Sequence, residues 1–209
     1  ITAYYDKLIA FNHHKTKYGS REHKKANYLA LIAANALEGI RFYVSFACSW
    51  SFVEQKKAME GNAKIIKFIC RDENIHLAGT QHLLKTLPKD DPEFASIIEE
   101  CRDEAIEIMM ATREQEKEWA KYLFKDGSMV GLNYEMLAEY IDFITAKRMR
   151  VLGLPIDFKP PAQDPLPWTQ KWIQGGSVQV APQEAALSSY INGGIKNDMD
   201  NNSLKGFSL

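Results

Sequence analysis

The stretch Ile65–Leu84 reads IIKFICRDENIHLAGTQHLL. Helical spacing places six of its side chains on one stripe: Ile65, Ile69, Glu73, His76, Thr80 and Leu83. The other four members predict a helix face that lines a bundle core, but Glu73 and His76 interrupt it with a carboxylate and an imidazole. A buried carboxylate is costly unless a hydrogen-bonding partner or a metal ion compensates it. The stripe alone leaves both alternatives open.

A second apolar stretch, residues 26–59, contains almost no helix breakers and predicts a long buried helix. One face of it carries Ala34, Glu38, Phe42, Ser45 and Phe46, so a carboxylate again lies in an apolar stripe. A pair between Glu38 and Arg41, three residues on, is the simple alternative. Two inward carboxylates on successive helices would repel each other, and a cation between them is the simplest explanation.

The remaining helical pattern predicts an all-α bundle of long helices. A turn is expected at residues 60–62 and a break at residues 87–92, where Asp91 caps a new helix and Pro92 takes its first position. That helix is expected to run to Phe124, and a last one from the Asn133 cap to about Val151. The buried face expected for the first of these comprises Ile97, Ile98, Cys101, Ala105, Ile108, Met109 and Thr112.

Composition changes twice along the chain, which predicts three regions. Residues 1–153 form the helical bundle portion, and residues 154–173 form an extended segment rich in proline and tryptophan. Residues 174–209 are rich in Gly, Ser and Asn and are expected to be a disordered, flexible tail. Its apolar end suits a partner-docking peptide, and Tyr190 within it reads, without further information, as an incidental tail residue.

Overall charge and cysteine content narrow the classes of partner. The 209 residues include 26 basic and 27 acidic side chains, so we expect neither nucleic acid nor an anionic membrane as partner. Three widely separated cysteines, Cys48, Cys70 and Cys101, have no disulfide or metal-knuckle spacing. They predict reduced thiols in a cytoplasmic protein.

Counting ligands gives half of a two-metal site. A di-iron site in a ferritin-like bundle takes one Glu from each of two helices and a Glu-x-x-His from each of two others. Glu38 supplies one such Glu, and Glu73 with His76 supplies one such motif. No other histidine has a glutamate three residues before it. Either two copies meet symmetrically, or the other half lies on absent polypeptide, which the non-Met start favours.

Three collinear motifs carry a resemblance to a known family. They are ALEGIRFYVSFAC at 36–48, EGNAKII followed by RDENIH within 60–76, and VAPQE at 180–184. The segment DGSMVGLN at 126–133 and the tail sequence SSY agree with them. Together they resemble the small, radical-generating subunit of class I ribonucleotide reductase, most of all its enterobacterial and phage type.

The resemblance implies roles for individual residues. Glu38, Glu73 and His76 would ligate one iron of a di-iron pair, although ligands of these types serve manganese equally. Phe42, Phe46 and Ile69 would form the apolar shell that shields the radical, with Ser45 near it. Asp72 would hydrogen-bond a ligand histidine on the radical-transfer route. Tyr190 would relay the radical to the large subunit, and Glu184 would be needed for that transfer.

The resemblance also implies an activity and partners. The subunit would generate a tyrosyl radical that the large subunit uses to reduce ribonucleotides to deoxyribonucleotides. It would form a homodimer and dock on the large subunit through residues 174–209. The first Asp ligand, the first Glu-x-x-His, the radical tyrosine and the relay tryptophan should precede Ile1, so we expect the chain to be the C-terminal part of a longer protein. The alternative is a non-catalytic helical fragment that docks through its tail without a complete metal site.

Overall fold

The computed structural model describes residues 1–14, 17–129 and 131–174, and these fold as the all-α bundle that the sequence predicts. Within this part of the chain, the only β-type pairing is an isolated bridge between Met129 and Leu132. The helical elements are α1 (Thr2–His13), α2 (Arg21–Ala36), η1 (Leu37–Arg41), α3 (Phe42–Lys56), α4 (Glu60–Asp90), α5 (Glu93–Glu100), α6 (Arg102–Leu123), α7 (Tyr134–Val151), η2 (Pro167–Thr169) and α8 (Gln170–Ile173).

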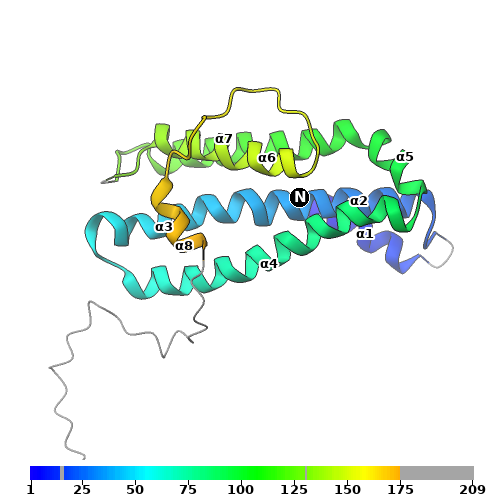
Figure 1. Cartoon of the computed structure of the whole chain (residues 1–209), viewed down its shortest axis with the longest axis horizontal. Helices are drawn as coiled ribbons and strands as arrows, with labels where there is room; N and C mark the ends of the chain where they lie inside the picture. The colour runs from blue at the N-terminus through cyan, green and yellow to red at the C-terminus, as the bar shows by residue number, and fades with distance from the viewer. Residues whose placement is uncertain (15–16, 130, 175–209) are drawn as a thin grey trace, which may run out of the picture.

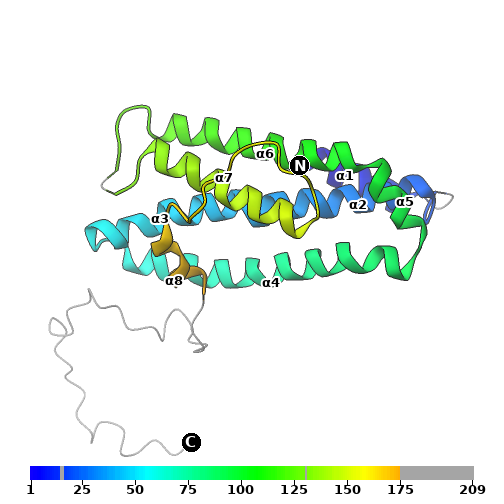
Figure 2. The same ribbon diagram turned by 45° about the horizontal axis from the view of Figure 1, so that its top comes forward.

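The central element is one continuous helix made of α2, η1 and α3, in which η1 is a π-helical segment. It runs between the α6–α7 pair on one side and α4 on the other, as Figure 1 and the rotated view in Figure 2 both show. By length and composition, Arg21–Lys56 could span a membrane, but 67% of its most apolar window is buried in the protein. Burial of this kind is what a central bundle helix requires.

The turn between α3 and α4 lies three residues earlier than the sequence predicted. Lys57 and Met59 have left-handed backbone conformations, with φ of 52° and 61°, and α4 already begins at Glu60. Glu60 pairs with Lys64 at 3.2 Å, one helical turn on. A pair of this spacing supports a helix start, so the glycine of the expected turn lies inside the helix.

The stripe predicted to line the core is instead largely exposed within the described bundle. The solvent-exposed fractions of Ile65, Ile69 and Leu83 are 51%, 40% and 48%. The face of α4 that packs on its neighbours carries Ala63, Cys70, Leu77 and Leu84. This face is rotated around the helix from the predicted stripe because α2 and α3 contact α4 from one side, and Glu73 and His76 lie at its border.

Two helix boundaries after α4 also differ from the prediction. Pro88 does not end α4, which continues to Asp90, because Leu84 and Leu87 on its last turns pack against the core. Asp91 Oδ1 accepts a hydrogen bond from the Glu93 amide at 3.0 Å, but α5 begins at Glu93, so Pro92 takes the N-cap position and not the predicted first helical position. The long helix then breaks at Cys101 into α5 and α6, but its predicted buried face is buried or partly buried throughout.

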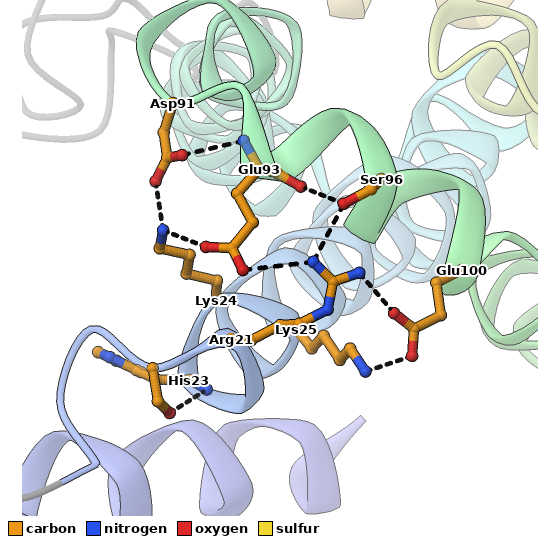
Figure 3. A network of polar contacts seen from close by, with 9 residues as sticks. Arg21, His23, Lys24, Lys25, Asp91, Glu93, Ser96 and Glu100 are labelled. Carbon is orange, nitrogen blue, oxygen red and sulfur yellow. Dashed lines mark hydrogen bonds and ion pairs between the residues drawn. The ribbon is translucent and has the colours of Figure 1, made fainter.

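A network of ion pairs joins the start of α2 to the α4–α5 junction (Figure 3). Arg21 contacts Glu93 at 3.3 Å and Glu100 at 2.8 Å. Lys24 contacts Asp91 at 2.6 Å and also pairs with Glu93. These contacts join residues about seventy positions apart in the sequence, so they connect α5 to α2.

The segment after α7 returns to the bundle through α8. The Trp172 ring stacks on Trp50 with centroids 5.8 Å apart, and its Nε1 donates to Glu54 at 2.9 Å. Lys171 pairs with the same carboxylate at 2.6 Å. Residues 154–173, predicted to be extended, thus end in a short helix anchored on α3.

Candidate metal centre

Three ligand-type side chains from two helices converge on one point. Glu38 comes from η1, and Glu73 and His76 from α4; one ligand atom of each lies within 4.8 Å of the others. His76 Nδ1 lies 3.3 Å from Glu73 Oε2. The group therefore gathers the three ligands that the sequence proposed.

Glu38 is the least satisfied member of this cluster. Its Oε2 is shielded from solvent and, among the described residues, has no hydrogen-bond partner. Burial, followed by the negative charge of Glu73, raises the pKa of the Glu38 carboxyl, while His76 opposes that rise. Shielded oxygens of this kind are normally paired, and a cation would satisfy this one and remove the repulsion.

The simple alternative for Glu38, a pair with Arg41, does not hold in the described structure, whereas Glu73 and His76 contact each other. Arg41 does not pair with Glu38; it reaches the buried Glu116 of α6 at 3.1 Å and also binds Gln115. Carboxylates and an imidazole are ligands that iron, manganese and zinc all accept. The donor set therefore fits a transition-metal ion.

Local structure explains why Glu38 faces α4. The π-helical turn Leu37–Arg41 inserts an i to i+5 pattern, in which the Phe42 amide donates to the Leu37 carbonyl. Such single turns shift the side chains that follow around the helix axis and are frequent at functional sites. No pattern in the sequence signalled this turn.

The other residues that the resemblance implied are only partly grouped around the cluster. Phe46 is buried and packs against Phe42 with centroids 6.2 Å apart, as an apolar shell requires. Ile69 and Ser45 are exposed in the described bundle. The Asp72 side chain is exposed, and its Oδ1 lies 3.7 Å from Nε of the adjacent Arg71. Tyr190 and Glu184 of the tail lie outside the described residues.

Sequence reasoning missed several polar groups close to the cluster. Tyr5 of α1 is near enough that the Glu38 charge, after burial, raises its pKa. Arg148 of α7, buried behind η1, donates from Nε to the Gly39 carbonyl at 3.1 Å. The sequence could have predicted the burial of Arg148, because this cation lies on the apolar face of the helix 134–151. Its neighbours on that face are Ile141, Ile144 and Thr145.

Known proteins resemble this chain along its whole length. The protein called ribonucleoside-diphosphate reductase subunit beta in Haemophilus influenzae is 49% identical, and the alignment covers all of this chain and 59% of that one. The subunit of the same name from Enterobacteria phage T4 is 46% identical over 90% of this chain and 49% of its own. This chain thus spans less than two thirds of the length of the curated relatives it matches.

Structure and family comparison agree with these matches. The solved R2 subunit of ribonucleotide reductase from Clostridium botulinum superposes with a TM-score of 0.64 at 26% identity, over 82% of this chain and 50% of that one. The predicted likeness to the enterobacterial and phage type is confirmed by relatives of both kinds at 46% identity. The family model for the ribonucleotide reductase small chain matches residues 5–165. The chain therefore belongs to the small-chain family of ribonucleotide reductase.

Proposed function

We propose that this chain supplies half of the di-iron centre of a ribonucleoside-diphosphate reductase small subunit. The observation that carries the proposal is the shielded, unpartnered Oε2 of Glu38 beside Glu73 and His76, in a chain of this family. Matches over the whole chain do not favour the alternative, a helical fragment that docks without a metal site.

Each of the three ligands has a distinct part in holding the metal. Glu38 and Glu73 contribute negative charge from opposite helices, and His76 contributes a neutral nitrogen donor. An iron pair bound here would supply one-electron and oxygen chemistry. The described residues would hold the ion, keep the aromatic side of the site dry through Phe42 and Phe46, and orient the carboxylates.

We propose that further polypeptide completes the ligand set. Three ligands leave an open side, because His76 keeps 57% of its side-chain surface. The exposed apolar side chains Ile65, Ile69 and Leu83 share the helix stripe of His76. Apolar side chains in this number favour helices packed over the site rather than solvent. A second copy of the chain is the competing source of ligands.

The activity and partners follow from the family. The radical formed with the metal pair would pass to the large subunit, where ribonucleoside diphosphates are reduced to deoxyribonucleotides. Residues 174–209 would dock on that subunit, Tyr190 and Glu184 would serve the transfer, and Asp72 would orient a ligand histidine. A homodimer and a cytoplasmic location complete the proposal.

Metal analysis of the full-length protein tests the ligand assignment. We expect about two iron ions per subunit, and loss of most of the iron in Glu38→Gln and Glu73→Gln. The control is Glu99→Gln on α5, whose side chain is 75% exposed; it should keep wild-type iron. Wild-type protein without iron, or ligand variants that retain it, would overturn the proposal.

A second measurement separates the two sources of the missing ligands. The 209-residue chain is loaded with Fe²⁺ and its mass followed by light scattering. We expect it to hold less iron than the full-length protein at any concentration. A symmetric dimer that binds iron as fully as the longer protein would show that two copies complete the site.

A further inference from the structure

The residue after each carboxylate ligand makes a polar contact behind the site. Gly39 follows Glu38, and its carbonyl accepts the hydrogen bond from Arg148 Nε at 3.1 Å. Asn74 follows Glu73, and its side-chain Oδ1 accepts a hydrogen bond from the Tyr43 hydroxyl. Both helical turns that carry a proposed carboxylate ligand are therefore hydrogen-bonded to side chains behind the site, Arg148 and Tyr43.

A third contact connects the Arg148–Gly39 and Tyr43–Asn74 hydrogen bonds. The Arg148 guanidinium lies 4.9 Å from the centroid of the Tyr43 ring, in cation–π geometry. Tyr43 is almost fully buried. The three side chains Arg148, Tyr43 and Asn74 thus form one chain of contacts from η1 to α4, which we call the rear network.

Arg148 is an unusual residue in this position. It is 9% exposed, and burial lowers the pKa of its guanidinium. Within the described residues, Arg148 donates to the Gly39 carbonyl and lies over the Tyr43 ring, and its charge interacts with Tyr43, Tyr140 and Cys70. No ion pair between Arg148 and a carboxylate is present among these residues. A buried cation without a counter-charge is costly, and an apolar side chain would fill the same space at lower cost.

The packing around Gly39 shows how closely Arg148 approaches the π-helical turn. A Cβ at position 39 would lie 3.0 Å from Arg148 Nε and 3.1 Å from Leu77 Cδ1 of α4. Both neighbours belong to elements that face the turn, α7 and α4. The absence of a side chain at position 39 is therefore what lets the guanidinium reach the backbone beside the ligand.

We propose that the rear network sets the separation of the Glu38 and Glu73 carboxylates, and that Arg148 is its positioning residue. The inference rests on the proposed metal site and adds a requirement to it. A π-helical turn departs from the regular α-helical hydrogen-bond pattern, and the Gly39 carbonyl within this turn accepts a hydrogen bond from outside the helix. Arg148 donates to that backbone, while Tyr43 fixes the neighbouring turn of α4 through Asn74.

Cobalt binding to the full-length protein tests the proposal without relying on turnover. Co²⁺ is titrated at 10 °C, and both its affinity and its visible absorption bands are recorded for wild type, Arg148→Met and Arg148→Lys. Outer contacts that orient ligands typically contribute 10–100-fold in metal affinity. We expect Arg148→Met to lose about that factor and to shift the cobalt bands, and Arg148→Lys to recover part of the loss because it keeps a donor.

Two further variants make the result specific. Arg150→Met removes an exposed cation of the same helix and should bind Co²⁺ as wild type does. Tyr43→Phe removes one hydroxyl from the network without changing its volume, and should weaken affinity by a smaller factor. It also decides the question if Arg148→Met does not fold.

The outcomes distinguish the inference from the function on which it rests. Wild-type protein that binds no Co²⁺ removes the metal site itself. Wild-type protein that binds Co²⁺, with folded Arg148→Met and Tyr43→Phe matching its affinity and spectrum, overturns the rear network while leaving the site intact. A lower melting temperature in Arg148→Met with unchanged cobalt binding counts as the same contradiction, because it assigns the residue to stability alone.

Discussion

At the scale of single residues, the candidate metal site includes a glycine as well as the three side chains that could ligate a metal. Gly39 follows Glu38 in the π-helical turn. Because it has no side chain, the Arg148 guanidinium can approach and donate a hydrogen bond to the Gly39 carbonyl. Glycine is ordinarily unfavourable inside a helix by up to about 1 kcal/mol relative to alanine. Its presence here is explained by the close approach of α4 and α7.

We expect Gly39→Ala to destabilise the protein despite the better helix propensity of alanine. The added methyl carbon would lie 3.0 Å from Arg148 Nε and 3.1 Å from Leu77 Cδ1, which is closer than ordinary van der Waals contact. Overpacking of this kind costs about 1–3 kcal/mol. Urea unfolding monitored by circular dichroism measures the change. Gly79→Ala is the control, because a Cβ there meets nothing within 4 Å; it should gain up to about 1 kcal/mol. Equal effects of the two substitutions would contradict the packing argument.

At the scale of helices, ion pairs connect α2 to the junction of α4 and α5. The cations Arg21, Lys24 and Lys25 on α2 face acidic residues of the α4–α5 junction (Figure 3). Lys24 is the main cause of the lowered pKa of Asp91 and Glu93, and Lys25 of the lowered pKa of Glu100. The contacts are partly solvent-exposed, so each contributes little alone and the network acts together.

These lowered pKa values predict acid sensitivity. A carboxyl whose folded pKa is depressed contributes stability above its ordinary pKa of about 4, and that contribution disappears as the pH falls through the folded value. At low salt, we expect the melting temperature to decrease when the pH is lowered below about 4. The melting temperature of Lys24→Met should decrease less than that of wild type, because the variant already lacks the ion pairs made by Lys24.

Melting curves between pH 2 and pH 7 at two salt concentrations check this. Lys85→Met, at an exposed position of α4 outside the network, should follow wild type. Salt should narrow the difference between wild type and Lys24→Met, since ions screen exposed pairs. Parallel curves for Lys24→Met and wild type at all pH values would be inconsistent with the network's contribution.

At the scale of the whole molecule, the bundle carries the candidate metal cluster, and the chain after α8 is proposed to carry the contact with the large subunit. Trp172 and Lys171 fix the end of the described chain on Glu54 of α3. Asn74 also donates to the Ile173 carbonyl at 3.2 Å. The point from which the proposed docking segment departs is therefore attached to the helix turn that carries Glu73.

Replacing Tyr190 by phenylalanine should separate metal assembly from transfer. In the full-length protein with its large subunit, we expect Tyr190→Phe to keep iron and the tyrosyl radical signal but to lose turnover, because phenylalanine cannot form the relay radical. Tyr18→Phe, at an exposed position of the bundle, is the control. Deleting residues 207–209 should instead weaken subunit affinity. Turnover that survives Tyr190→Phe would show the relay assignment to be wrong.

The sequence alone determined the helical fold and predicted the three side chains of the candidate metal cluster. Helical periodicity and capping residues are local, so Asn133, whose side chain accepts a bond from the Met136 amide, could be assigned from its neighbours. The motif in Ile65–Leu84 likewise needed only the spacing of Glu73 and His76 within one helix.

Only the tertiary structure decided what surrounds those three side chains. The π-helical turn at Glu38, the exposure of Ile65 and Ile69, and the burial of Arg148 against Gly39 depend on which helices contact each other across the bundle. Contacts between segments more than a hundred residues apart leave no periodic signal in either segment. Helical periodicity specifies that a face is apolar, whereas the packing of other chain segments decides whether that face is covered.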